Sequence, residues 1–209
     1  MKSKEFDIRS GVVRQLLSEG IVRGDIRHEI TLDTSSSGGR GDIIVLQDRE
    51  IIGIELKSGS DILDNAEKQM ADYRLSFDRV GLICDKIHEE KIRRVSWMYR
   101  IFYCHDTRAT VQTYGAGWEP AKILPKYSAL YESGGTNIPY MASLLWKKEI
   151  DGVMHKLDMK TGTRCRSINR LKEDARLSEL RPLVISALRS RVLSKWEQSF
   201  WTKFDKEAA

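Results

Sequence analysis

The pattern of apolar and polar positions in the first 115 residues predicts helices and strands in alternation. Apolar residues at helical spacing predict an amphipathic helix over residues 6–17, and residues 26–32 follow as a first strand. Two apolar, β-branched runs flank the polar tetrad 47–50 and predict a hairpin of two buried strands. The pattern then predicts a helix over about 62–76 and a buried parallel strand at 79–84, followed by a helix at 88–97 and short strands at 101–104 and 109–114. Together these elements predict an α/β core with a mixed sheet.

The remainder of the chain predicts a linker followed by helices. Residues 115–139 hold three of the four prolines, and we assign 116–140 as an irregular linker. It would separate a core at 1–115 from a helical region at 141–209, with helices at 141–154, 167–177 and 182–204. The last helix carries aromatic residues at helical spacing, which favours core packing or a dimer contact over stacking on bases: Trp196, Phe200, Trp201 and Phe204.

Acidic residues occupy symmetric positions on the two hairpin strands. The midpoint of Asp42 and Glu55 falls at the centre of the predicted turn, so an antiparallel hairpin places these carboxylates opposite each other, with Cβ atoms about 5 Å apart. Lys57 lies on the same strand face as Glu55, because side chains alternate with period two. Like charges repel across a ladder, and a bound divalent cation would explain the pair. Charged strand ends at a solvent boundary are the alternative.

These residues resemble the signature of a nuclease superfamily. Asp42 followed by Glu55-Leu56-Lys57 resembles the PD-(D/E)XK motif, with Gly41 in place of the proline. Gln69 and Tyr73 are four apart on a predicted helix and resemble the Q-x-x-x-Y element of RecB-like members. The layout is most similar to small, poorly characterised bacterial and phage members with a helical C-terminal tail. The residues that match these members are Asp7-Ile8-Arg9, Arg40-Gly41-Asp42 and Leu145-Trp146.

The resemblance implies a restriction-endonuclease-like core and a metal-dependent deoxyribonuclease that hydrolyses phosphodiester bonds of DNA. Mg²⁺ is the implied cofactor, Mn²⁺ is expected to substitute for it, and no small-molecule cofactor is expected. The implied catalytic residues are Asp42, Glu55, Lys57, Gln69 and Tyr73. The implied metal ligands are Asp42, Glu55, the backbone carbonyl of Leu56 and, as an extra upstream acid, Glu29. The residues expected to contact DNA are Arg40 and Ser58.

Two of these positions have a second interpretation. Glu29 also fits the polar face of a half-buried strand, and Tyr73 also falls in the apolar stripe of its helix. Cysteine and histidine occur together at Cys84, His88, Cys104 and His105, but without the paired spacing of a structural zinc site. We therefore expect the two cysteines to be buried strand residues.

The positive charge is concentrated in the C-terminal third. Residues 147–209 contain 15 Lys and Arg against 9 Asp and Glu, a net charge of +6, whereas the whole chain carries +5. By difference, residues 1–146 carry about −1. A clustered basic face is typical of nucleic-acid binding, and a solvated helical surface of mixed charge is the alternative. DNA is the expected partner, and a homodimer is left open.

The composition and the N-terminal residues argue against a membrane-spanning or secreted protein. No stretch approaches the ~20 apolar residues of a membrane span, and the N-terminal residues lack the apolar segment of a secretory signal. Three widely spaced cysteines favour reduced thiols, so we expect a cytoplasmic protein. The alternative function is a non-catalytic nucleic-acid-binding or protein-interaction module on the same fold, such as a phage defence or counter-defence protein.

Overall fold

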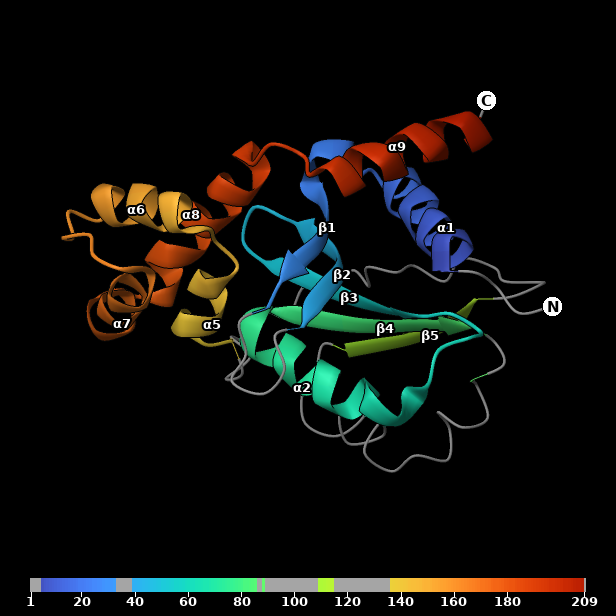
Figure 1. The fold of residues 1–209 in the computed structure, drawn as a ribbon, viewed down its shortest axis with the longest axis horizontal. Coiled ribbons are helices and arrows are strands. Elements are labelled where there is room, and N and C mark those ends of the chain that lie inside the picture. Colours follow the sequence, from blue (N-terminus) through green and yellow to red (C-terminus); the bar gives the residue numbers. More distant parts are fainter. Residues whose placement is uncertain (1–4, 33–38, 86–87, 89–108, 115–135, 209) are drawn as a thin grey trace.

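A five-stranded mixed sheet forms the centre of the protein. The computed structural model describes residues 5–32, 39–85, 88, 109–114 and 136–208. The sheet order is β1-β2-β3-β4-β5 (Figure 1). The antiparallel part contains β1 (Ile26–Thr31), β2 (Arg40–Leu46) and β3 (Ile51–Lys57). The parallel part adds β4 (Arg79–Asp85) beside β3 and β5 (Ala109–Tyr114) beside β4. The predicted mixed α/β core is confirmed, while the helix predicted at 88–97 and the strand at 101–104 lie outside the described residues.

Helices lie on both faces of this sheet (Figure 1). One face packs against α1 (Glu5–Ser18) and α9 (Lys195–Ala208), which belong to opposite ends of the chain. The other face packs against α2 (Ala66–Ser76) and a group of four helices, namely α5 (Ile138–Ser143), α6 (Lys147–Lys156), α7 (Arg164–Asp174) and α8 (Leu177–Ser190). Short 3₁₀ turns, η1 (Arg23–Asp25) and η2 (Leu63–Asn65), precede β1 and α2. No described helix has the length and apolar character needed to cross a membrane.

Strand β1 changes the face to which its side chains point. Ile26 packs in the core with α1 and α9, whereas Ile30 and Leu32 pack in the core with α2. Regular alternation would put residues 26, 30 and 32 on one face. Glu29 lies between the two halves with φ at +54°, in the left-handed region that residues other than glycine rarely adopt. The backbone at Glu29 therefore reverses the alternation, and the strand contributes to both cores.

Gly53 lets the aromatic ring of Phe77 lie directly on strand β3. A Cβ atom at Gly53 would lie 2.2 Å from Phe77 Cδ2, which is too close for any side chain. We therefore expect Gly53→Ala to lower the free energy of unfolding by about 1–3 kcal/mol through overpacking. Gly152, where an added Cβ meets nothing within 4 Å, is the matched control. On helix α6, Gly152→Ala should raise stability by about 0.5–1 kcal/mol. Urea unfolding of both variants measures the difference, and equal stabilities would contradict this packing.

The helix predicted at 141–154 is wrong as a single element. Helix α5 ends at Ser143 and α6 begins at Lys147, after a break at residues 144–146. Glu149 Oε2 accepts a hydrogen bond from the Trp146 backbone N–H at 2.7 Å and so begins a new helix there. Helix α5 begins at Ile138, so residues 138–140 of the predicted linker are helical; residues 116–135 of the linker lie outside the described part of the chain.

The single helix predicted at 182–204 is also wrong. Helix α8 begins at Leu177 and runs through Pro182 to Ser190, and α9 begins at Lys195. Ser194 Oγ accepts from the Glu197 N–H at 3.1 Å, and Glu197 Oε2 accepts from the Ser194 N–H at 2.8 Å. This reciprocal pair is a capping box, which starts α9 as a separate helix. Helix α7 spans Arg164–Asp174, three residues earlier than the predicted 167–177.

Candidate functional site

The β2–β3 hairpin brings two carboxylates together at its open end. Ile43 pairs with Ile54, so the next opposed positions along this register are Asp42 and Glu55. Asp42 Oδ2 accepts a hydrogen bond from the Leu56 N–H at 2.8 Å, across the two strands. Glu55 is 2% exposed, and its Oε2 atom is buried without a well-formed hydrogen bond among the described residues. The structure thus contains the opposed pair that the symmetry of the turn predicts.

The surroundings of the pair disfavour two negative charges. Burial raises the pKa of Asp42 well above its usual range, and the charge of Glu55 raises it further. The charge of Arg9 acts in the opposite direction, because a nearby cation stabilises the carboxylate. The site is therefore a place where an additional cation would lower the free energy of the ionised pair.

Lys57 is held between the strand and helix α2. Its Nζ lies 2.8 Å from Glu55 Oε1 and donates a hydrogen bond to Gln69 Oε1 at 2.6 Å. Lys57 is 8% exposed, so its ammonium group is fixed by these two oxygen atoms in a mostly buried position. One member of the predicted Gln69–Tyr73 pair therefore sets the position of the lysine.

The second member of the pair contacts the backbone of β2. The Tyr73 hydroxyl accepts a hydrogen bond from the Asp42 N–H at 2.8 Å, and its ring packs against Phe77 with a centroid distance of 5.2 Å. Tyr73 thus belongs both to the core and to the site. Burial raises the pKa of this phenol well above its usual range, and the charges of Glu55 and Asp42 raise it further. Tyr73 is therefore a neutral hydrogen-bonding group at neutral pH.

Arg9 belongs to the Asp7-Ile8-Arg9 match, but no role in the site was assigned to it from the sequence. It is 1% exposed and reaches from helix α1 to Asp42, donating from Nη1 to the backbone carbonyl and from Nη2 to Oδ1 at 3.4 Å. The same Nη2 lies 2.8 Å from Glu29 Oε1 and 2.7 Å from Glu5 Oε1. One buried guanidinium therefore joins three carboxylates and fixes Asp42 at two points.

Glu29 lies beside this guanidinium. Its position in β1 falls between the pairs His28–Ile43 and Ile30–Gly41, opposite Asp42. Burial raises the pKa of Glu29, whereas Arg9 lowers it. No three His, Cys, Asp or Glu side chains within the described ranges are grouped closely enough to hold a metal ion together. The role of Glu29 as a metal ligand stays a prediction, and the contact that it makes is with Arg9.

The two residues expected to contact DNA differ in exposure. Arg40 is 68% exposed, with Nη1 4.0 Å from Glu29 Oε2. Ser58 is 2% exposed, its hydroxyl lies 2.9 Å from Ser60 Oγ, and its N–H donates to Asp61 Oδ2 at 2.6 Å. Ser58 therefore shapes the turn after β3, and Arg40 faces solvent.

Of the cysteine and histidine residues considered as a zinc site, only Cys84 and His88 lie within the described residues. Cys84 is buried in β4 as predicted, and His88 Nε2 lies 2.8 Å from the Ser58 carbonyl oxygen. Cys104 and His105 lie outside the described residues.

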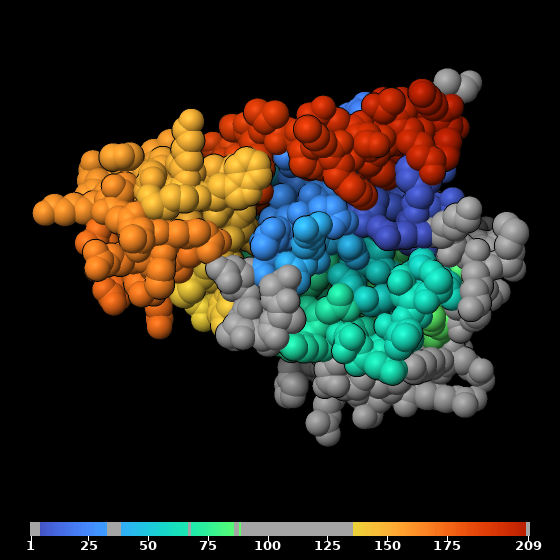
Figure 2. All heavy atoms as spheres, viewed as in Figure 1, coloured from blue at the N-terminus to red at the C-terminus, as the bar shows by residue number. Residues whose placement is uncertain are grey.

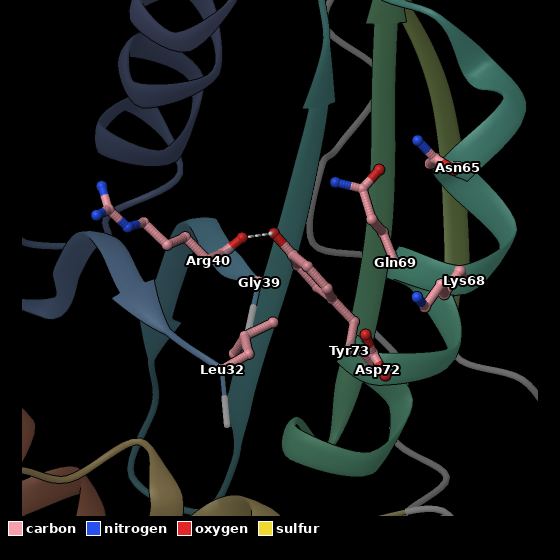
Figure 3. A pocket seen from close by; sticks show the side chains of 8 residues that line it. All are labelled: Leu32, Gly39, Arg40, Asn65, Lys68, Gln69, Asp72 and Tyr73. Atoms are coloured by element: carbon pink, nitrogen blue, oxygen red, sulfur yellow. Dashed lines mark hydrogen bonds between the residues drawn. The ribbon is translucent and has the colours of Figure 1, made fainter. Parts of the chain in front are cut away.

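A cavity of about 280 Å³ opens between the start of β2 and helix α2 (Figure 3). Gln69 and Tyr73 line it, so it adjoins the Lys57–Glu55–Asp42 group. The remaining lining residues are Leu32, Gly39, Arg40, Asn65, Lys68 and Asp72. Arg40 faces the cavity with its backbone carbonyl, which lies 3.5 Å from the Tyr73 hydroxyl, while its side chain points away (Figure 3). The cavity therefore offers one basic side chain, Lys68, and several hydrogen-bonding groups beside the carboxylates.

His28 is a buried neutral histidine behind the site. Its ring lies 4.6 Å from the ring of Phe200, and burial, together with the nearby charge of Arg9, lowers its pKa from 6.5 to about 3. As the pH falls below 6.5, the unfolded chain binds this proton before the folded chain does. His28 therefore removes stability as the pH falls, by about 1.4 kcal/mol per pH unit down to a pH of about 3.

We expect the His28→Phe variant to lose this dependence of stability on pH. Its free energy of unfolding relative to the wild type should rise by about 2 kcal/mol between about pH 6.5 and about pH 5. Comparison with the wild type cancels the opposite contributions of Asp42 and Glu29. Urea unfolding at these pH values measures it, with His155→Phe on the exposed side of α6 as control. Parallel pH curves for wild type and His28→Phe would contradict the buried neutral state.

The fold and site define a mixed α/β protein with an opposed pair of acids and a lysine at the end of a hairpin. The family model described as bacteriophage P4 protein cII matches residues 1–109, more than half of the chain. The chain belongs to this bacteriophage protein family. No curated protein and no solved structure matches the chain. The matched residues contain β1 to β4 with α1 and α2, and hence Arg9 and all the predicted site residues.

Proposed function

We propose that this protein is a metal-dependent deoxyribonuclease of the PD-(D/E)XK type, with a restriction-endonuclease-like core and Mg²⁺ as cofactor. The observation that supports this most is the opposed pair of Asp42 and Glu55 with Lys57 beside it. Core packing gives no reason for a buried glutamate, a half-buried aspartate and a mostly buried ammonium group to lie together at the end of an apolar hairpin. Binding of a cation and a phosphate group at this place would explain the arrangement.

The residues present fit a Mg²⁺ ion. Glu55 Oε2 is buried without a well-formed hydrogen bond in the described part of the chain, and a metal ion would satisfy it. A divalent cation would also offset the like charges that raise the pKa of Asp42. Asp42 and Glu55 would hold the ion, with the backbone carbonyl of Leu56 as the further expected ligand. Bound there, Mg²⁺ would polarise the phosphate and lower the pKa of a bound water.

Lys57 would act on the reacting groups, and helix α2 would hold the site in place. The ammonium group of Lys57, fixed by Glu55 and Gln69, would orient the attacking water and neutralise negative charge that develops on the phosphate. Tyr73 holds the Asp42 backbone and so keeps the first carboxylate opposite the second. These contacts fix the reactive groups before a substrate arrives, which removes reorganisation from the reaction step.

The charge distribution supports DNA as the substrate. Lys68 lines the cavity beside the carboxylates and can contact a phosphate group that enters it. Residues 156–172, at the end of α6 and along α7, contain six Lys and Arg and one Asp. That local net charge of +5 equals the charge of the whole chain. A concentrated basic surface attracts a polyanion through counterion release.

The direct test is cleavage by the purified protein. Supercoiled, linear and single-stranded DNA are incubated with Mg²⁺, with Mn²⁺ and with EDTA, and Glu55→Gln purified in the same way controls for contaminating nucleases. We expect cleavage that requires the metal ion and is absent from the variant. Absence of cleavage with either ion would overturn the proposal. Salt-sensitive DNA binding without cleavage would instead favour the non-catalytic nucleic-acid-binding module.

A further inference from the structure

Helix α9 reaches the candidate site through one tryptophan. The ring of Trp196 lies over the guanidinium of Arg9, with 4.8 Å from Cζ to the ring centroid. The ring is also stacked on Phe200, with an interplanar angle of 1° and a centroid distance of 5.7 Å. In the space-filling view, α9 lies against α1 and the first strand (Figure 2). Trp196 therefore forms one wall of the space that Arg9 occupies.

Trp196 would act on the site through the orientation of the Arg9 guanidinium. Its two terminal nitrogen atoms contact Asp42 at the backbone carbonyl and at Oδ1, and contact Glu29 at Oε1. A guanidinium is planar, so the orientation of its plane decides which of these oxygen atoms it can reach. An aromatic face packed on that plane restricts its rotation and attracts its charge. Trp196 thus favours the one orientation in which Arg9 contacts both carboxylates.

The position of Trp196 is itself fixed by its neighbour in the chain. Glu197 is 2% exposed and binds β1 at two points, accepting from Arg27 Nη2 at 3.1 Å and from the His28 N–H at 3.2 Å. These contacts set the start of α9 against β1, the strand that carries Glu29. Trp196 is itself 42% exposed, so its side chain can be changed while the Glu197 contacts remain.

We propose that α9 is part of the metal site, with Trp196 as a positioning residue that holds Arg9 against Asp42 and Glu29. This inference rests on the proposed metal-dependent function. It assigns a role in the site to a helix that lies beyond residues 1–109, the part that the family model matches. The benzene ring of phenylalanine can replace the indole over Arg9, whereas an aliphatic side chain cannot.

The test compares Trp196→Leu with Trp196→Phe in the full chain. Mn²⁺ affinity is measured by calorimetry without DNA, kcat and KM for cleavage are measured separately, and thermal unfolding reports the fold. We expect Trp196→Leu to weaken Mn²⁺ binding and to lower kcat by about three- to tenfold, with little change in KM. Trp196→Phe should restore both to within about twofold of the wild type.

Trp146 provides a matched control. It is 58% exposed and lies 4.4 Å from the Cζ of Arg191, so it is another exposed tryptophan on a guanidinium, and it contacts none of Arg9, Asp42 or Glu55 in the described structure. Trp146→Leu should leave Mn²⁺ binding unchanged. Wild-type Mn²⁺ affinity in Trp196→Leu, or equal losses in Trp196→Leu and Trp196→Phe, would overturn this inference and leave the nuclease proposal standing. A wild-type protein that neither binds Mn²⁺ nor cuts DNA would overturn both.

Discussion

Replacing Glu55 by glutamine is expected to reduce metal-dependent cleavage of DNA about a thousandfold or more, which corresponds to a loss of about 4 kcal/mol of transition-state stabilisation. Glutamine keeps the size of the side chain but removes the negative charge that would hold the metal ion. It also removes the carboxylate that lies 2.8 Å from Lys57 Nζ, so the lysine keeps its hydrogen bond to Gln69 but loses its ion pair. Both changes act on the groups proposed to touch the metal and the phosphate.

The loss should occur without unfolding. Glu55 is buried opposite Asp42, so removing its charge relieves a repulsion and offsets part of the lost contact with Lys57. Cleavage rates and thermal unfolding are therefore measured on the same preparation. Asp48→Asn is the matched control, because Asp48 lies in the turn of the same hairpin and its side chain is 91% exposed. Activity in Glu55→Gln within tenfold of the wild type would show that the hairpin is not the reaction site.

Replacing Glu197 by alanine is expected to lower the free energy of unfolding by about 3–5 kcal/mol. Glu197 and Arg27 form an ion pair whose side chains are both 3% exposed, with 3.1 Å between Arg27 Nε and Glu197 Oε1. The variant leaves a buried guanidinium without its carboxylate and the His28 N–H without its acceptor. Burial already lowers the pKa of Arg27 although Glu197 acts to raise it, which indicates how costly the unpaired charge would be.

Glu207 is the control for this second substitution. It lies on the same helix, its side chain is 44% exposed, and it is 3.7 Å from Arg14, whose side chain is 48% exposed. A solvated pair of this kind contributes little, so Glu207→Ala should change stability by less than about 0.5 kcal/mol. Urea unfolding compares the two variants. Similar stabilities for Glu197→Ala and Glu207→Ala would mean that α9 does not hold β1 through this pair.

The sequence predicted the local parts of the site well. The hairpin register follows from a turn centred between two acids, and the alternation of strand side chains then puts Lys57 beside Glu55. The spacing of Gln69 and Tyr73 put both on one face of α2, where they reach Lys57 and Asp42. These features depend on neighbours within one hairpin or one helix, and short-range geometry is sufficient to derive them.

Arg9 was matched to the nuclease members but was assigned no role in the site, because its partners are distant in sequence. Asp42 is 33 residues away and Glu29 is 20, and no periodic pattern connects them to α1. A weak signal did exist, since Arg9 lies three and four residues before Val12 and Val13 of the apolar stripe and so faces inward. The separate start of α9 had a clearer signal in the spacing of Ser194 and Glu197, which matches a capping box.

The ion pair between β1 and α9 has a consequence for how the protein is made. Its two members are 170 residues apart, so Arg27 leaves the ribosome long before Glu197 has been synthesised. Until then, the apolar face of α1 and β1 lacks the aromatic residues of α9 that cover it. Such a face favours association of unfinished chains and binding by chaperones. A chain stalled before α9 therefore leaves this apolar surface exposed to solvent, and the surface is covered only when α9 packs against β1 and the ion pair forms.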